Sequence, residues 1–168
     1  MMNPVIKLTV LVLLAGLFAL LAHADLTRRR LPNRWIAYYA LLFPFYAWGM
    51  DMNWTQLIGH GVTALAAFLL LLLLFTRGGI GGGDVKLGTV VMLWAGLSSS
   101  AAVLIVVSLA GALLGMAGWL TDKCRTSQTT SGTAWQAALS ARRGVPYGVA
   151  LVCGGITALA EQYGWIPT

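Results

Sequence analysis

Residues 68–86 read FLLLLLLFTRGGIGGGDVK, in which an apolar run is followed by a glycine-rich segment and a single carboxylate. The run from Phe68 to Phe75 is typical of a helix that faces lipid. The glycines after it weaken a helix and expose backbone polar groups. At membrane depth such backbone is tolerated only where protein buries it or where it lines a hydrated cavity. The segment therefore predicts the end of a membrane helix beside a hydrated pocket that contains Asp84.

The rest of the chain has the same apolar character. It has 168 residues, of which 58% are hydrophobic and 10% charged, and its mean hydropathy is +0.79. A soluble domain cannot bury that much apolar surface. We predict an all-α membrane protein, a bundle of six transmembrane helices that forms one membrane-embedded domain over residues 1–168. The apolar runs lie near residues 4–24, 35–50, 55–75, 85–97, 100–120 and 145–165, and the fourth is too short to cross a bilayer alone.

The basic residues predict the orientation of this bundle. All but Lys7 lie in the loops after the first, third and fifth runs, while the turns at residues 51–53 and 98–100 contain none. Cytoplasmic loops hold the excess of Lys and Arg, so both termini are expected to be non-cytoplasmic. The net charge of +6 is then explained by topology and contact with membrane lipids, which argues against nucleic acid as a partner.

Two parts of the chain allow more than one interpretation. Residues 1–24 also resemble a secretory signal that ends in Ala22-His23-Ala24. Cleavage there would place four arginines outside, against the charge rule. The polar loop of residues 121–143 either forms a short interfacial helix around Trp135–Leu139 or stays mobile.

Cysteine and histidine give no pattern of a metal site. Cys124 and Cys153 are far apart and have no CxxC spacing, so neither zinc nor a disulfide framework is indicated. His23 and His60 lie in different runs, which makes a nucleophile activated by histidine a poor interpretation. We expect no metal and no cofactor.

Two of the five acidic residues are candidates for chemistry. Asp51, Asp122 and Glu161 are expected to be solvated, whereas Asp25 and Asp84 adjoin apolar runs at the predicted cytoplasmic face. A carboxylate in that position is costly and points to function. If the first and fourth helices pack side by side, the two carboxyl groups face each other and share one proton.

Such a pair contains an acid and a base together. One carboxylate can deprotonate water while the other protonates the leaving group, which is the chemistry of amide hydrolysis. Asp84 begins a helix, where the dipole favours an anion, and Asp25 ends one. Asp84 is therefore the predicted base and Asp25 the predicted acid, although Arg28 and Arg29 could reverse the order.

Three short elements carry a family resemblance. Asp25 is followed by Arg30-Leu31-Pro32-Asn33, the glycine-rich segment ends in Gly81-Gly82-Gly83-Asp84-Val85-Lys86, and the last run begins with Pro146-Tyr147-Gly148. In this order they resemble the type IV prepilin peptidases, membrane aspartyl proteases of the GxGD class. The short chain looks most similar to the branch that serves tight-adherence (Flp-type) pili.

The resemblance implies an aspartic endopeptidase of the bacterial cytoplasmic (inner) membrane. It would remove the short basic leader peptide that precedes the apolar helix of prepilins or pseudopilins, at the cytoplasmic membrane face. The pilus assembly machinery would be a further partner. Asp25 and Asp84 would be the catalytic pair. Gly81 and Gly83 would give access to the backbone, and Pro146 and Gly148 would form a supporting wall.

Larger members of that family carry an amino-terminal domain, commonly with paired cysteines, that N-methylates the trimmed pilin. This chain begins at its first apolar run and lacks such pairs. We therefore expect no methyltransferase domain or activity, and S-adenosylmethionine is not implied.

Two other classes of function remain open from the residues alone. A small proton- or ion-coupled transporter could use the same two aspartates as a relay. Apart from Lys86, no charged residue lies mid-span on the far half of any predicted helix to continue such a relay, which disfavours this alternative. A structural assembly partner would tolerate neutralisation of both acids.

Overall fold

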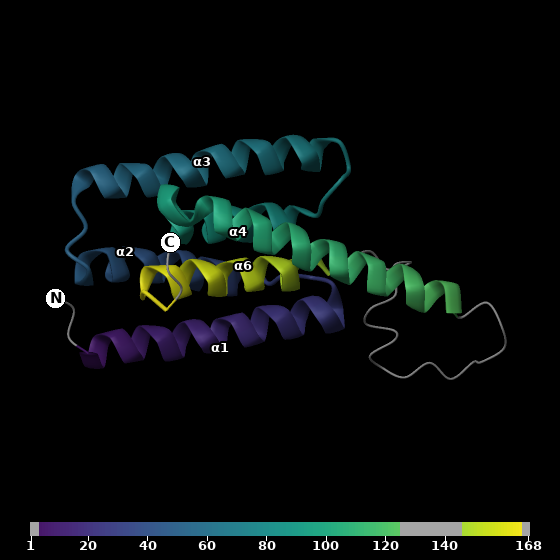
Figure 1. Cartoon of the computed structure of the whole chain (residues 1–168), viewed down its shortest axis with the longest axis horizontal. Helices are drawn as coiled ribbons and strands as arrows, with labels where there is room; N and C mark the ends of the chain where they lie inside the picture. The colour runs from purple at the N-terminus through teal and green to yellow at the C-terminus, as the bar shows by residue number, and fades with distance from the viewer. Residues whose placement is uncertain (1–3, 125–145, 166–168) are drawn as a thin grey trace.

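The computed structural model describes residues 4–124 and 146–165, and in these ranges the chain is helical without strands (Figure 1). The predicted all-α class is thereby confirmed. The predicted interfacial helix around Trp135–Leu139 lies outside the described residues. The helices are α1 (Pro4–Arg28), α2 (Asn33–Gly49), α3 (Trp54–Thr76), α4 (Gly82–Cys124) and α6 (Tyr147–Gln162).

Three segments are long and apolar enough to cross a membrane, namely Leu8–Arg28, Trp54–Thr76 and Gly82–Lys123. The clearest is α3, of which only Thr63 and Ala64 are buried. Most of its leucines face outward, and Leu69 is 57% exposed. A helix that is apolar on its outer face has lipid as its solvent.

Helix α4 reverses its direction at Gly96. This glycine has φ 62° and ψ −169° inside an otherwise helical segment. A Cβ atom on Gly154 of α6 would lie within 4 Å of both Val91 and Val107, residues that a straight helix would separate by about 24 Å. The segments before and after Gly96 are therefore two antiparallel arms, which match the fourth and fifth predicted runs (Figure 1).

The position of this reversal corrects the sequence prediction. Residues 98–100, the predicted turn, are helical. Gly96 takes the turn because a left-handed φ favours glycine. A Cβ atom there would also lie only 2.6 Å from the ring of His60.

Side chains from two other helices satisfy the backbone at this break. The carbonyl oxygen of Leu93 lies 2.7 Å from Nδ1 of His60, and since a carbonyl can only accept, Nδ1 donates the proton. The carbonyl of Trp94 accepts a hydrogen bond from the side-chain amide of Gln162. Carbonyl groups that a helix end leaves unpaired thus find partners on α3 and α6.

The core of the bundle is built around Trp94 in the first arm of α4. Its indole is fully buried and donates to the carbonyl oxygen of Tyr39 at 3.1 Å. The Tyr39 ring stacks on it with centroids 5.4 Å apart, and the Phe43 ring meets it edge-on. These aromatic contacts fix the first arm against α2.

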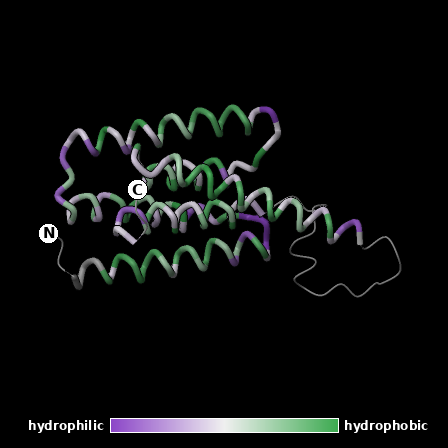
Figure 2. Tube along the Cα trace, in the orientation of Figure 1, coloured by the Kyte–Doolittle hydropathy of each residue, from purple (hydrophilic) through white to green (hydrophobic). Residues whose placement is uncertain are grey.

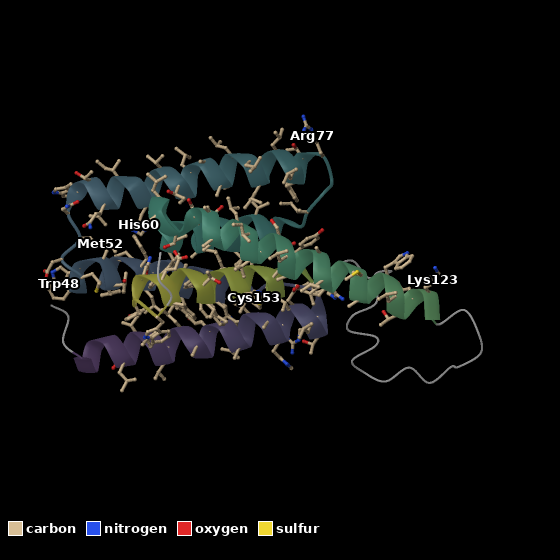
Figure 3. The ribbon with its side chains drawn as sticks, in the orientation of Figure 1. Trp48, Met52, His60, Arg77, Lys123 and Cys153 are labelled. Carbon is tan, nitrogen blue, oxygen red and sulfur yellow. The ribbon has the colours of Figure 1, made fainter. Side chains whose placement is uncertain are left out.

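The two ends of the bundle differ in charge. Arg77 and Lys123 lie toward the end where α1 finishes, whereas Trp48 and Met52 lie at the other end (Figure 3). Hydrophilic residues gather at the helix ends, most clearly in the connection from α1 to α2 (Figure 2). Helix α1 begins and α6 finishes at the less charged end (Figure 1).

Candidate active site

Asp25 lies in the last turn of α1 and its side chain is only 6% exposed. Its Oδ2 atom accepts a hydrogen bond from the backbone N–H of Val149 at 3.1 Å. Val149 is in the first turn of α6, whose N-cap residue, Pro146, provides no side-chain hydrogen bond. Asp25, a residue of α1, therefore caps the N-terminus of α6. The dipole of α6 favours a negative charge at this end.

Gly148 and Pro146 hold this carboxylate from the side of α6. A Cβ atom on Gly148 would lie 2.8 Å from Cγ of Asp25, so only glycine allows the approach without displacement. Pro146 is fully buried, and its carbonyl oxygen also accepts from the Val149 N–H at 3.1 Å. Gly148 thus lies against the Asp25 side chain, and Pro146 binds the same amide that donates to Asp25.

Asp84 lies in the first turn of α4, folded against the glycine-rich segment. Its Oδ2 atom accepts from the N–H of Gly81 at 3.3 Å. The N–H groups of Asp84 and Val85 in turn donate to the carbonyl of Gly81 at 3.1 and 3.2 Å. These reciprocal bonds form a local turn that starts the helix and fixes the carboxylate.

The glycines at positions 81 and 83 allow two close approaches. A Cβ atom on Gly81 would lie 3.1 Å from Oδ2 of Asp84, and one on Gly83 would lie 3.2 Å from Cβ of Leu31. The second contact brings the glycine-rich segment against the connection between α1 and α2. Bulkier residues at positions 81 and 83 would push the neighbouring groups apart.

Asp25 and Asp84 line one cavity of about 430 Å³, and their charges repel each other. The sequence predicts that the two carboxyl groups face each other if the first and fourth helices pack side by side. Helices α1 and α4 are not packed side by side, however, because they are not a helix pair in extended contact. Instead, α6 packs against both of them. The other lining residues come from both motif segments: Arg29, Arg30, Leu31, Asn33, Gly81, Gly82 and Gly83.

A basic residue next to Asp25 adds to the electrostatics of the cavity. Arg29 directly follows α1 with φ 50°, a conformation that costs a non-glycine residue about 1 kcal/mol. Its N–H donates to the carbonyl of Asp25 at 3.1 Å, and its guanidinium attracts the Asp25 carboxylate. The site thus combines two acids with a neighbouring cation.

Sequence reasoning missed two contacts of the site. The Val149 amide leaves no signal, because every residue except proline supplies one. The second contact is a hydrogen bond of 3.0 Å from Nζ of Lys86 to Oδ1 of Asn33. Asn33 and Lys86 each belong to one of the motif segments quoted from the sequence. Their place in these segments is the sequence signal that could have indicated a contact between them.

The contact between Asp25 and α6 also affects the prediction of which carboxyl group is the acid and which is the base. The prediction placed the anion on Asp84 because only Asp84 begins its own helix. In the structure Asp25 lies at the start of α6 as well. Both carboxylates thus lie at helix N-termini, and the dipole argument no longer distinguishes them.

Within residues 4–124 and 146–165, no group of three or more His, Cys, Asp or Glu side chains could hold a metal ion. What the cavity contains is a pair of carboxylates beside glycine backbone. These groups suit proton transfer to and from a substrate.

The fold and the cavity together define a class: helical membrane proteins with paired carboxylates at one end of the bundle. A sequence model of the type IV leader peptidase family matches residues 11–116, a range that includes both carboxylates and ends before Pro146. The chain belongs to this family.

A curated relative extends the match along the chain. The prepilin leader peptidase/N-methyltransferase of Bacillus subtilis (strain 168) is 30% identical over 158 residues, which are 91% of this chain and 55% of that protein. The chain therefore spans about half the length of this relative. No solved structure matches the chain significantly.

Proposed function

We propose that this protein is an aspartyl endopeptidase that cleaves the leader peptide of prepilins or pseudopilins at the cytoplasmic membrane face. The observation that carries the proposal is the shared cavity of Asp25 and Asp84, walled by the glycine-rich segment. Membership of the leader peptidase family and the name of the Bacillus relative support the choice of substrate.

The proposed reaction is direct hydrolysis of a peptide bond. One carboxylate removes a proton from water, and the resulting hydroxide adds to the carbonyl carbon of the scissile bond. The other carboxyl group gives its proton to the departing amine as the C–N bond breaks. Glycine backbone at positions 81–83 leaves room for an extended substrate beside both acids.

The proposal includes a membrane arrangement. Six spans in the bacterial cytoplasmic membrane, with both termini non-cytoplasmic, would place the cavity and Arg77 at the cytoplasmic side. The two arms of α4 would be the fourth and fifth spans. Basic residues at that face, such as Lys123, would contact anionic lipid.

The relative's name includes a second activity, N-methylation. Our proposal covers cleavage by one membrane-embedded domain, and absence of methylation stays a prediction. The mass of the processed pilin after coexpression tests this prediction directly, because N-methylation would raise that mass by the fixed mass of a methyl group.

Coexpression of candidate prepilins with wild type, Asp25→Asn and Asp84→Asn tests the peptidase assignment. Each substitution keeps the size of the side chain but removes proton transfer, so cleavage should fall by about 10²–10⁴-fold. Asp51→Asn, in the turn between α2 and α3, is the matched control and should cleave normally. Normal processing by either site variant would refute the assignment.

The alternative of an ion-coupled transporter makes a different prediction. Both site variants would then abolish proton or ion flux in vesicles, while leader cleavage would be absent even in wild type. Purified protein in vesicles of defined lipid separates the two functions.

A further inference from the structure

A long apolar groove leads away from Asp84 along the bundle. It consists of two hollows of about 460 and 380 Å³. Both are lined by Leu71, Val107 and Leu151, so the two hollows adjoin at these residues and follow one another along the bundle. Its walls are α3 and the second arm of α4, and the first arm of α4 and α6 contribute to its floor.

The groove is as long as a membrane-spanning helix. On the second arm its lining runs from Leu97 to Met116, a rise of about 28 Å. This is close to the thickness of the hydrocarbon core of a bilayer, which is about 30 Å. The length therefore suits one apolar helix that lies along α4.

The part of the groove next to Asp84 has small side chains on the second arm. Ser108, Gly111, Ala112 and Gly115 line it there. In lipid, helices associate where small residues let their backbones approach closely. This wall can therefore hold a second helix without displacing the bundle.

Asp84 joins the groove to the candidate active site. It lines both the larger apolar hollow and the cavity that contains Asp25. A chain that emerges from the groove at this end meets the carboxylates directly. The groove is thus continuous with the proposed site of cleavage.

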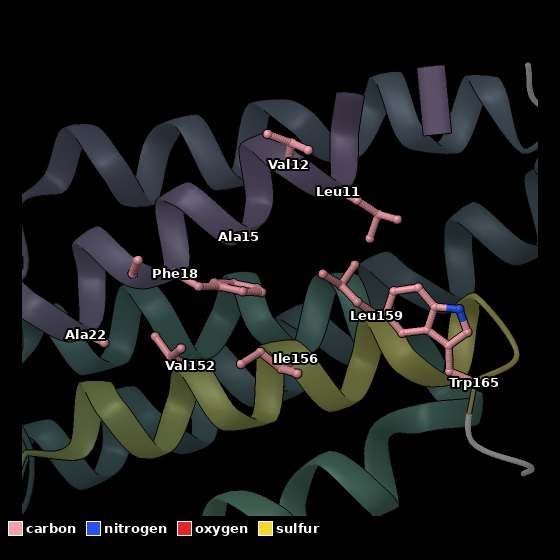
Figure 4. A pocket seen from close by; sticks show the side chains of 10 residues that line it. Leu11, Val12, Ala15, Phe18, Ala22, Val152, Ile156, Leu159 and Trp165 are labelled. Atoms are coloured by element: carbon pink, nitrogen blue, oxygen red, sulfur yellow. The ribbon is translucent and has the colours of Figure 1, made fainter. Parts of the chain in front are cut away.

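A third hollow, of about 580 Å³ between α1 and α6, lacks this connection. Its ten lining residues are all apolar, and their side chains meet between the two helices (Figure 4). Ala22, one turn before Asp25, is its nearest lining residue along α1. The Asp25 carboxylate itself is bound to the start of α6 and does not line this hollow.

We infer that the groove between α3 and α4 binds the apolar helix that follows the leader of the substrate, with the junction of leader and helix at Asp84. This inference rests on the proposed function and assigns the substrate's helix to one face of the bundle. The helix runs from Asp84 toward Leu97, and the leader extends into the cavity between the two acids.

Three substitutions to phenylalanine at exposed alanines test this assignment. Ala112→Phe and Ala66→Phe fill the groove from its two walls, and Ala19→Phe fills the hollow between α1 and α6. Each is assayed on a membrane-embedded prepilin and on a short peptide that ends soon after the cleavage site. The groove variants should lower the ratio of prepilin to peptide cleavage by about tenfold, and Ala19→Phe should leave it unchanged.

Site-specific photocrosslinking in an Asp84→Asn background gives a second, positive readout. A photoreactive residue at position 112 should crosslink to the prepilin helix, and one at position 19 should not. Crosslinks from position 19 alone, or from position 112 to a second copy of this chain, would overturn the inference. So would a substrate ratio that Ala112→Phe and Ala66→Phe leave unchanged.

Failure of the inference can be told apart from failure of the proposed function. If wild type cleaves neither substrate, the peptidase assignment itself is wrong. If wild type cleaves both, the aspartate variants cleave neither and the groove variants behave as wild type, the function holds and the groove assignment is wrong.

Discussion

The surroundings of Asp25 and of Asp84 are built in opposite ways. Asp25 is buried in a helix, 6% exposed, and bound to an amide of α6 at 3.1 Å. Asp84 is half-buried and bound to Gly81 of its own turn at 3.3 Å. One carboxylate is thus fixed by tertiary packing, and the other by a local turn in a glycine-rich segment.

This difference separates the roles of the two halves of the cavity. The residues around Asp25 cannot move without displacing α6, so the position of the Asp25 carboxylate is fixed. The segment before Asp84 is held by bonds within a single turn, one from Gly81 to the carboxylate and two to the Gly81 carbonyl, and it can adjust its backbone because glycine tolerates many conformations. Under the proposed function, we expect the approach of a substrate to alter the Asp84 side of the cavity more readily than the Asp25 side.

Lengthening each acid by one methylene gives the largest expected contrast. Asp25→Glu must move its carboxylate away from the Val149 amide or into Gly148, and a displacement of about 1 Å can cost roughly 100-fold in rate. Asp84→Glu can be absorbed by the glycine-rich segment, so its loss should stay near 10-fold. Cleavage rates of purified variants measure both, and equal losses would contradict the contrast.

Adding one methyl group beside each acid gives the next contrast. A Cβ atom at Gly148 would lie 2.8 Å from Cγ of Asp25, and one at Gly81 would lie 3.1 Å from Oδ2 of Asp84. Gly148→Ala should lower cleavage by about 10-fold and Gly81→Ala by about 2-fold.

The matched control for these two variants is Gly61→Ala, where the added Cβ atom would meet nothing within 4 Å. Its cleavage rate should equal that of wild type. A greater loss in Gly81→Ala than in Gly148→Ala would show that the Asp84 side is the rigid one.

The hydrogen bond between Lys86 and Asn33 should have a smaller effect. It joins α4 to α2 at 3.0 Å between exposed groups, and such a bond contributes about 0.5–1.5 kcal/mol. Lys86→Met and Asn33→Ala should each lower cleavage by about 2- to 5-fold. The double variant should lose no more than the worse single variant, and additive losses would show that the bond does not position Asp84.

The smallest effect on cleavage is expected at the opposite end of the bundle. Asn53 caps α3 in a reciprocal pair with Gln56, and Asn53→Ala should lower the free energy of unfolding by about 1 kcal/mol. Cleavage per folded molecule should not change. Thermal unfolding and a rate assay on the same sample check this, and a lowered rate would mean that the two ends are coupled.

The sequence predicted those parts of the structure that depend on local composition. The apolar runs define the helices, and the glycine-rich segment marks the start of α4 with Asp84 in its first turn. The sequence also places Asp25 and Asp84 at run ends that the charge pattern assigns to one face, but it leaves open whether the two carboxyl groups lie close together at rest.

Features that depend on packing between distant segments could not be predicted. Nothing near Asp25 indicates that α6 will donate an amide to it, so its electrostatic setting was judged from its own helix alone. The reversal of α4 was placed at polar serines, whereas the close ring of His60 requires glycine at position 96. Burial and steric contact decided both cases, and neither is visible in a local pattern.

The reversal at Gly96 also has a consequence for the surrounding bilayer. The first arm of α4 has about 14 residues and rises roughly 21 Å, against about 30 Å of hydrocarbon. In the proposed orientation this hydrophobic mismatch leaves Asp84 below the cytoplasmic lipid surface unless the membrane thins locally. Acyl-chain length should therefore influence how easily water and a leader peptide reach the carboxylates.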